Sequence, residues 1–166
     1  MIVATGFDHA GVALRARLLP LVEAAGHEVL DLGTDRADPP IDYPDKALAV
    51  GQAVVSGQAQ RGVIVCGSGA GVAVAACKIR GVRATTVHDT YTAHQAVEHD
   101  NLNVPCLGGR VVGSELAAEI LTAFLGAVFS GEERHVRRLA RVAEIEITGG
   151  VGAPAEVITP ERGSTL

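Results

Sequence analysis

A cysteine ends an apolar run and precedes a glycine-rich turn in residues 63–71, which read VIVCGSGAG. Such runs are typical of buried parallel strands, and ligands bind beyond the carboxyl ends of these strands, where Cys66 would stand. Gly67, Gly69 and Gly71 allow a tight turn whose main-chain N–H groups can face a bound anion. A helix starting after this turn would favour negative charge at its N-terminus, including the thiolate form of Cys66. The segment predicts a thiol base or nucleophile beside an anion-binding loop.

The same loop has other interpretations. Cys66 could be a core cysteine before a structural turn, although three alternating glycines disfavour this. A dinucleotide-binding G-x-G-x-x-G segment would need glycine at position 72, where Val72 stands, and would follow the first strand rather than the third. A cysteine-based phosphatase loop would need arginine at that position. We therefore favour a thiol that acts beside a developing oxyanion.

Other ionisable residues follow other predicted strands. Asp8 and His9 come directly after the first apolar run, in GFDHAG. Asp8 alone could cap the following helix, but two adjacent ionisable residues at this edge favour a site. Tyr43 belongs to a predicted loop over residues 34–45 that is long enough to cover a pocket, and packing under the loop is an equally good role for it.

Histidine and arginine residues supply further candidates. His99 stands where a helix gives way to a strand, and imidazole suits proton transfer near neutral pH. His88, at the end of the fourth predicted strand, competes for that role. Arg110 follows the fifth strand, and Arg134 and Arg138 lie four residues apart on one helix face. Charged helix residues are usually solvated, but arginine is the residue for bidentate phosphate recognition.

Short β-branched runs alternate with longer alanine-rich stretches, which must position these residues. We expect strands at 2–7, 27–33, 62–67, 82–87 and 104–109, and helices at 11–26, 46–57, 71–81, 90–100, near 113–128 and at 131–146. Pro20 weakens the expected continuity of the first helix. Apolar strands that do not alternate, each followed by a helix, indicate a parallel sheet covered on both faces. The predicted fold class is α/β, a doubly wound, Rossmann-like three-layer fold with a five-stranded parallel sheet.

Composition sets the broad class. The chain has 166 residues, of which 48% are hydrophobic, and this suits one domain over residues 1–147. From residue 148 the sequence turns to Gly, Pro and Thr, so we expect a C-terminal extension over 148–166. A net charge of −5 and only 3% aromatic residues disfavour binding to nucleic acid or to membranes.

The cysteines and the N-terminal segment indicate whether the protein binds a cofactor and in which cellular compartment it is found. The three cysteines form no C-x-x-C pair, so we expect neither a metal site nor another cofactor. Scattered, unpaired thiols are typical of reducing compartments. The first residues lack the basic start of a signal peptide, and no apolar stretch reaches the roughly 20 residues that cross a bilayer. These features predict a cytoplasmic protein.

Several segments carry a resemblance to a known family. They are GFDHAG, DLGT, DYPD, CGSGAGVAVAACKIRGVRA, HDNLNV, GGRVVG and RHVRR. Their order and spacing over roughly residues 1–146 resemble the type B ribose-5-phosphate isomerase family, which includes the galactose-6-phosphate isomerase subunits. The family interconverts aldose and ketose phosphates through a cis-enediolate without a metal, which implies a role in the pentose phosphate pathway or related carbohydrate metabolism.

The resemblance implies roles for individual residues. Cys66 would move a proton between C1 and C2, and Ser68 with the loop amides would stabilise the enediolate. His99, with Asp8, would help to open the furanose ring. The residues expected to contact the sugar phosphate are His9, Tyr43, Gly67, Gly69, Ala70, Gly71, Asp100, Arg110, Arg134 and Arg138, of which His9 and the three arginines would hold the phosphate.

The resemblance also implies an assembly and a substrate class. Family members are dimers or dimers of dimers with sites built from two subunits, so His99 would serve the neighbour's Cys66. Ribose 5-phosphate is the expected substrate. Asp100 stands where an asparagine is common in the family, so a tetrose or hexose phosphate is an alternative substrate. A non-catalytic phosphosugar-binding module is a further alternative, although a binder has no use for a thiol at position 66.

Overall fold

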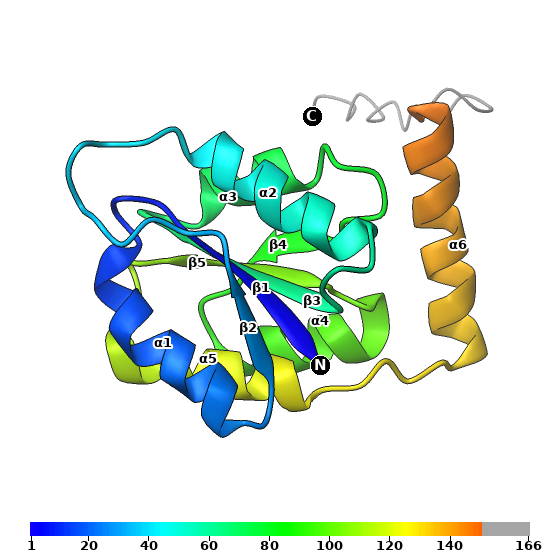
Figure 1. Ribbon diagram of the computed structural model, residues 1–166. Helices are drawn as coiled ribbons and strands as arrows, with labels where there is room; N and C mark the ends of the chain where they lie inside the picture. The colour runs from blue at the N-terminus through cyan, green and yellow to red at the C-terminus, as the bar shows by residue number, and fades with distance from the viewer. Residues whose placement is uncertain (151–166) are drawn as a thin grey trace, which may run out of the picture.

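Five parallel strands form a single sheet in the order β2-β1-β3-β5-β4 in the computed structural model, which describes residues 1–150 (Figure 1). The strands are β1 (Ile2–Phe7), β2 (Glu28–Asp31), β3 (Arg61–Cys66), β4 (Ala84–Thr86) and β5 (Val104–Gly108). The helices are α1 (Val12–Ala24), α2 (Tyr43–Val55), α3 (Ala70–Ala76), α4 (Thr90–Asp100), α5 (Ser114–Gly126) and α6 (Glu133–Thr148). The predicted fold class is confirmed.

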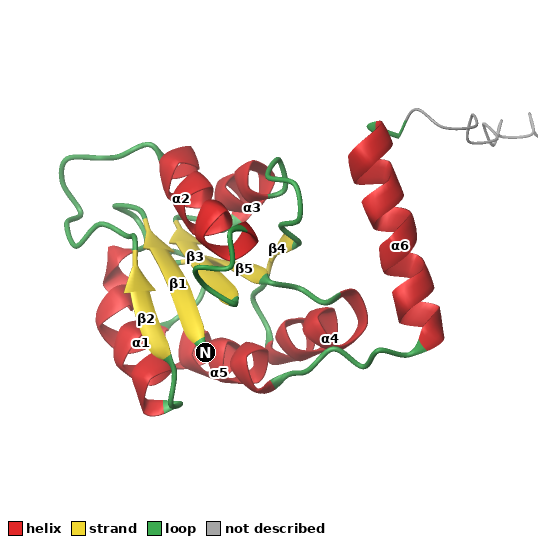
Figure 2. Cartoon of the chain, turned by 45° about the vertical axis from the view of Figure 1, so that its right-hand side comes forward, coloured by secondary structure: helices red, strands yellow, loops and turns green. Residues whose placement is uncertain are grey.

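Helices cover both faces of the sheet (Figure 2). Helices α1, α4 and α5 pack on one face, against side chains such as Val63, Val65 and Leu107. Helices α2 and α3 pack on the other, against the alternate residues Ile64 and Cys66 and their neighbours. Because successive side chains of a strand point to opposite faces, these uninterrupted apolar strands supply two cores at once.

The boundaries differ from the expected ones in two informative places. Helix α2 begins at Tyr43, three residues early, because Pro44 suits the first turn of a helix and removes only an amide that would have no partner there. Tyr43 is thus fixed in a helix rather than in a loop. Strands β2 and β4 are shorter than expected, and both lie at an edge of the sheet.

Pro20 leaves α1 intact. The helix is continuous from Val12 to Ala24, with Pro20 on its exposed side. The sequence suggested a weaker helix here, but the apolar contacts of Leu14, Leu18 and Val22 with the sheet hold it in place.

Helix α6 stands away from the body of the molecule (Figures 1 and 2). Its apolar side chains Val136, Val142, Ile145 and Ile147 are 49–63% exposed, and His135 is its only fully buried residue. The helix ends at Thr148, and most of the predicted extension, residues 151–166, lies outside the described residues. Within residues 1–150, no helix has the length and hydrophobicity that spanning a bilayer requires.

Candidate active site

A cavity of about 430 Å³ opens at the carboxyl ends of the central strands. It contains ionisable, hydroxyl and thiol groups from β1, β3, α2 and the turn after β5. The lining residues are Asp8, His9, Ala10, Tyr43, Cys66, Gly67, Ser68, Gly71, Arg110 and Val111. The structure therefore brings together most of the residues that the sequence singled out, and adds Ala10 and Val111, which carry no chemical signal in the sequence.

Cys66 is the last residue of β3 and is only 5% exposed, yet it lines the cavity. Its sulfur accepts a hydrogen bond from the amide of Gly69 at 3.1 Å. Gly69 has φ +80°, and a Cβ there would lie 2.9 Å from the carbonyl oxygen of Cys106, so the turn requires glycine. A thiolate at this position would gain a donor that is already aimed at it.

The loop after Cys66 is supported by the end of β5. The amide of Gly109 donates to the carbonyl of Cys66 at 2.7 Å, and the amide of Arg110 donates to the carbonyl of Gly67 at 3.0 Å. His88 Nε2 accepts from the amide of Gly108 at 3.1 Å. This contact occupies one ring nitrogen of His88 and fastens it to the end of β5.

Ser68 contributes an exposed hydroxyl to the cavity wall. Its Oγ accepts from the amide of Ala70 at 3.3 Å, so its own proton is available to a substrate oxygen. The amides of Gly69 and Ala70 are therefore directed at the sulfur and the hydroxyl of this loop.

Asp8 accepts main-chain hydrogen bonds in the turn before α1 and also lines the cavity. It is 4% exposed, and its Oδ1 accepts from the amides of Ala10 and Gly11 at 2.8 and 2.9 Å, which caps the turn before α1. The carboxylate also lines the cavity. Two fixed main-chain donors orient it, so its second oxygen can act on a ligand.

His9 and Tyr43 form a further wall of the cavity. His9 Nδ1 accepts from the amide of Ile41 at 3.2 Å, so neutral His9 carries its proton on Nε2 and can donate it to a ligand. Tyr43 packs over the start of α3, where a Cβ on Gly71 would lie 2.9 Å from its ring. Tyr43 thus lines the cavity from the first turn of α2 instead of packing under a loop, and its contact with a ligand stays a prediction.

Four predicted residues lie elsewhere in the chain. His99 and Asp100 are in the last turn of α4, and Arg134 and Arg138 are on α6. Helix α4 starts near the carboxyl end of β4 and runs back toward the amino-terminal ends of the strands. His99 thus lies about 15 Å along the helix, at 1.5 Å per residue. One chain therefore does not bring His99 to Cys66.

The surroundings of His99 include a residue that sequence reasoning missed. His99 Nδ1 lies 3.1 Å from the side-chain nitrogen of Gln95, and its ring stacks on His135 with centroids 4.2 Å apart. Burial, followed by the nearby His99 and Arg134, lowers the pKa of His135 below its ordinary value. The only sequence signal for His135 was its place within RHVRR, between the two arginines.

The other cysteines differ from Cys66. Burial raises the pKa of the Cys106 thiol, which keeps it protonated and unreactive. Cys77 is exposed, and its sulfur lies 3.1 Å from the carbonyl oxygen of Ala84. Cys66 alone combines a fixed donor with a place in the cavity wall.

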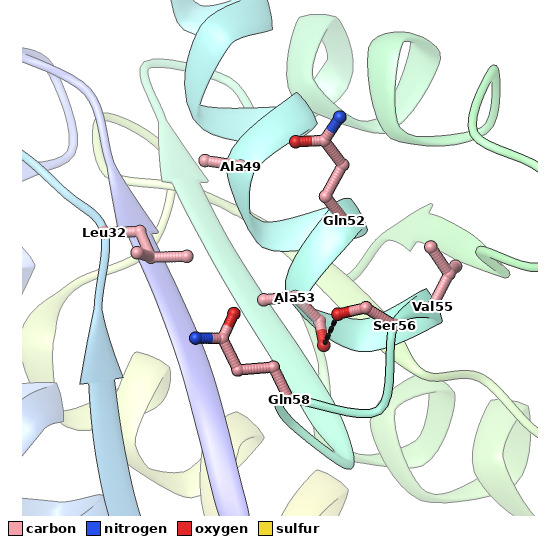
Figure 3. Close-up of a pocket in the computed structure, with 7 residues that line it drawn as sticks. All are labelled: Leu32, Ala49, Gln52, Ala53, Val55, Ser56 and Gln58. Carbon is pink, nitrogen blue, oxygen red and sulfur yellow. Dashed lines mark hydrogen bonds between the residues drawn. The ribbon is translucent and has the colours of Figure 1, made fainter.

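A larger hollow of about 530 Å³ lies beside α2 and has no ionisable lining residue (Figure 3). It is lined by Leu32, Ala49, Gln52, Ala53, Val55, Ser56 and Gln58, and the Ser56 hydroxyl donates to the carbonyl of Ala53. Proton transfer needs titratable groups, so the smaller cavity at Cys66 is the candidate site. Across the described part of the chain, no three His, Cys, Asp or Glu side chains lie close enough to hold a metal ion.

Comparisons with known proteins identify the family of the chain. A model of the ribose/galactose isomerase family matches residues 3–142. Ribose-5-phosphate isomerase B of Escherichia coli is 38% identical over 87% of this chain and 95% of its own. D-erythrulose-4-phosphate isomerase of Pectobacterium atrosepticum is 39% identical over 78% of this chain and 85% of its own. The structure of ribose-5-phosphate isomerase B from Clostridium thermocellum superposes with a TM-score of 0.86 at 39% identity, covering 90% of this chain and 99% of that one.

Proposed function

The chain belongs to the ribose/galactose isomerase family and is an isomerase of phosphorylated sugars, and we propose that it converts ribose 5-phosphate to ribulose 5-phosphate with Cys66 as the base. One observation carries the proposal: the Cys66 sulfur accepts the Gly69 amide in the wall of a cavity that also holds Asp8, His9 and Arg110. A binding module would gain nothing from this arrangement of the thiol.

The proposed chemistry moves one proton along the sugar. The thiolate of Cys66 removes the proton on C2, the electrons of that bond form the C1=C2 double bond, and negative charge moves to O1. The proton then returns from sulfur to C1, while the hydroxyl proton of O2 passes to O1. The charged oxygens are stabilised by the Ser68 hydroxyl and by loop amides other than those of Gly69 and Ala70, which face the sulfur and Ser68 Oγ. One such donor is worth about 2.7–4 kcal/mol. This path uses protein groups alone, so we expect activity to survive dialysis against a chelator.

We further propose that a second subunit completes the site. His99, Asp100 and the two arginines lie away from Cys66 in one chain, and the apolar side chains of α6 are left uncovered. A two-fold dimer would cover part of α6 and would place His99, Arg134 and Arg138 of one copy at the cavity of the other. His99 would then assist opening of the sugar ring, and the arginines would join Arg110 and His9 at the phosphate.

Mixed dimers test this assembly. Cys66→Ala and His99→Asn are each expected to be inactive as homodimers. Dissociating and reassociating an equal mixture should restore about one quarter of the wild-type activity, because half of the dimers are mixed and each of these has one intact site. An inactive mixture that still forms dimers would place Cys66 and His99 of the same chain in one site. A monomeric mass for the wild-type protein would reject the assembly altogether.

The substrate has one favoured alternative. Relatives named for ribose 5-phosphate and for D-erythrulose 4-phosphate are almost equally similar to this chain, so identity does not separate the two sugars. Turnover and exchange of deuterium from solvent should be measured on a panel of tetrose, pentose and hexose phosphates. The proposal expects the highest kcat/KM for ribose 5-phosphate. A higher value for erythrulose 4-phosphate would favour the alternative, and no exchange with any sugar would favour a binding module.

A further inference from the structure

His135 is a buried histidine to which the proposed reaction gives no role. It is 1% exposed, although it belongs to a helix whose other side chains are largely open to solvent. Its Nδ1 lies 2.7 Å from the hydroxyl oxygen of Ser130. Its Nε2 is buried and has no hydrogen-bond partner among the described residues. A buried polar atom without a partner is unfavourable, so the position of this ring needs another explanation than its hydrogen bonding.

The ring of His135 lies against the ring of His99. The centroids are 4.2 Å apart and the planes are tilted by 31°. On its edge, His99 is held by Gln95, whose side-chain nitrogen lies 3.1 Å from Nδ1. One neighbour thus fixes the face of the His99 ring and the other fixes its edge. Nε2 of His99 lies 4.0 Å from a carboxylate oxygen of Glu98, beyond hydrogen-bond distance, and is the nitrogen left for a substrate.

Ser130 joins this pair to α4. Its amide donates to the carbonyl of Glu98 at 2.9 Å, directly before His99, while its hydroxyl contacts His135. The amide of His135 donates to the carbonyl of Glu132 at 2.9 Å. The segment from Ser130 to His135 is therefore fastened to the last turn of α4 at Glu98, the residue before His99. This attachment keeps the rings of His135 and His99 in contact.

The charge of His135 is compatible with a supporting ring. Burial, together with His99, Arg134 and Arg138, lowers its pKa, whereas Glu132 opposes this effect. A neutral His135 at pH 7 does not repel His99 when His99 takes up a proton. A charged group at the same place would disfavour that proton at a distance of about 4 Å.

We propose that His135 is a positioning residue whose ring holds the face of His99, so that His99 Nε2 is aimed at the closed sugar ring of the partner's site. This inference rests on the proposed function, because it takes His99 as the group that assists ring opening. It predicts a separation between two half-reactions. Ring opening needs a well-aimed His99, whereas proton exchange on an open-chain ketose phosphate needs Cys66 and the loop of residues 67–71.

The experiment compares these two half-reactions in His135→Ala. We expect turnover of the cyclic aldose phosphate to fall about tenfold to hundredfold, which is part of the roughly 10²–10⁴-fold that a well-placed proton-transfer group supplies. Deuterium exchange at C1 of the open-chain ketose phosphate should stay within about threefold of wild type. His135→Phe keeps a buried ring and should restore most of the aldose turnover. Tyr91→Ala, which removes a 74% exposed aromatic ring from the same helix as His99, is the matched control and should change neither rate.

The possible outcomes distinguish a positioning role of His135 from a purely structural one. Equal losses in both half-reactions would show that His135 only holds the structure together, and no loss would show that His99 does not depend on it. If His135→Phe is as poor as His135→Ala, the nitrogen atoms are required and the supporting-ring role is wrong. His99→Asn separates the inference from the function on which it rests. If that variant fails to show the same separation, ring opening by His99 is itself disproved.

Discussion

The amide of Gly69 donates a hydrogen bond of 3.1 Å to the sulfur of Cys66. Gly69 adopts a left-handed conformation, which glycine adopts without strain, and the nearby carbonyl of Cys106 leaves no room for a Cβ at this position. The donor is fixed before any substrate binds, so it stabilises a negative sulfur without reorganisation during the reaction. The loop thereby links a local feature of the sequence, alternating glycines, to the reactivity of one thiol.

Replacing Cys66 by alanine tests that link. We expect Cys66→Ala to lower turnover on the order of 10³-fold, because the proton on C2 loses its base. Ribitol 5-phosphate, a reduced analogue that cannot isomerise, should still bind within a few fold of wild type by calorimetry. Cys77→Ala removes an exposed thiol that does not line the cavity and should be fully active. Substantial activity in Cys66→Ala would mean that another group is the base.

Binding of the substrate's phosphate group is expected to depend on Arg138. Arg138→Ala should raise KM for the phosphorylated sugar about tenfold to hundredfold, the range for one hydrogen bond to a charged group. Arg137→Ala is the matched control, because Arg137 is exposed on the same helix but points from a different side of it. We expect its KM to stay within about twofold. Equal effects of the two substitutions would indicate a general loss of positive charge instead of a specific contact.

The sheet and the cavity could be predicted because their signals are local. Apolar runs that do not alternate report burial on both faces, and the end of such a run places Cys66 and Asp8 at the functional edge. The exact start of α2 differs from the prediction because proline is common both in loops and in the first turn of a helix, and the sequence alone does not separate the two.

The surroundings of His99 could not be predicted in the same way. The stacking on His135 joins positions far apart in the sequence, through a segment that reaches α4 only at Ser130. Nothing in the spacing of RHVRR tells which residue turns inward, because α6 has little apolar surface buried in its own chain. A pattern of burial identifies inward positions only when the element packs against its own core.

The contact between Gly71 and Tyr43 supports a test of the cavity wall. Gly71→Ala would place a Cβ 2.9 Å from the Tyr43 ring, which is 41% exposed and can swing aside. We expect KM to rise several-fold because the displaced ring lines the cavity, with a loss of less than about 1 kcal/mol in the free energy of unfolding. In a Tyr43→Ala background the same substitution should have no further effect on KM, since its neighbour is gone.

Two results would contradict this interpretation of the wall. Additive effects of Gly71→Ala and Tyr43→Ala would show that the two residues act separately. An equal rise in KM for Gly113→Ala, at a glycine whose Cβ would meet nothing within 4 Å, would show that the effect is not specific to the cavity.

The ion pair between Arg15 and Asp31 predicts how stability depends on pH. Burial alone would raise the pKa of Asp31, but the Arg15 guanidinium and the amide of Gly33 outweigh it and hold that pKa below its ordinary value. The folded state therefore prefers ionised Asp31. Its contribution is fully present above the unfolded pKa, near pH 4, and is lost as the pH falls through the lower folded value.

Urea unfolding of Asp31→Asn at several pH values tests this prediction. The pair is partly exposed to solvent, so we expect a loss of about 1 kcal/mol in the free energy of unfolding at pH 7. The difference from wild type should shrink below pH 4, because protonation then removes the ion pair from the wild-type protein as well. Asp35→Asn is the control, since its pair with Arg36 is 73–78% exposed and should contribute nothing measurable at either pH. A difference for Asp31→Asn that persists unchanged at pH 3 would show that the hydrogen bonds of residue 31, rather than its charge, stabilise the fold.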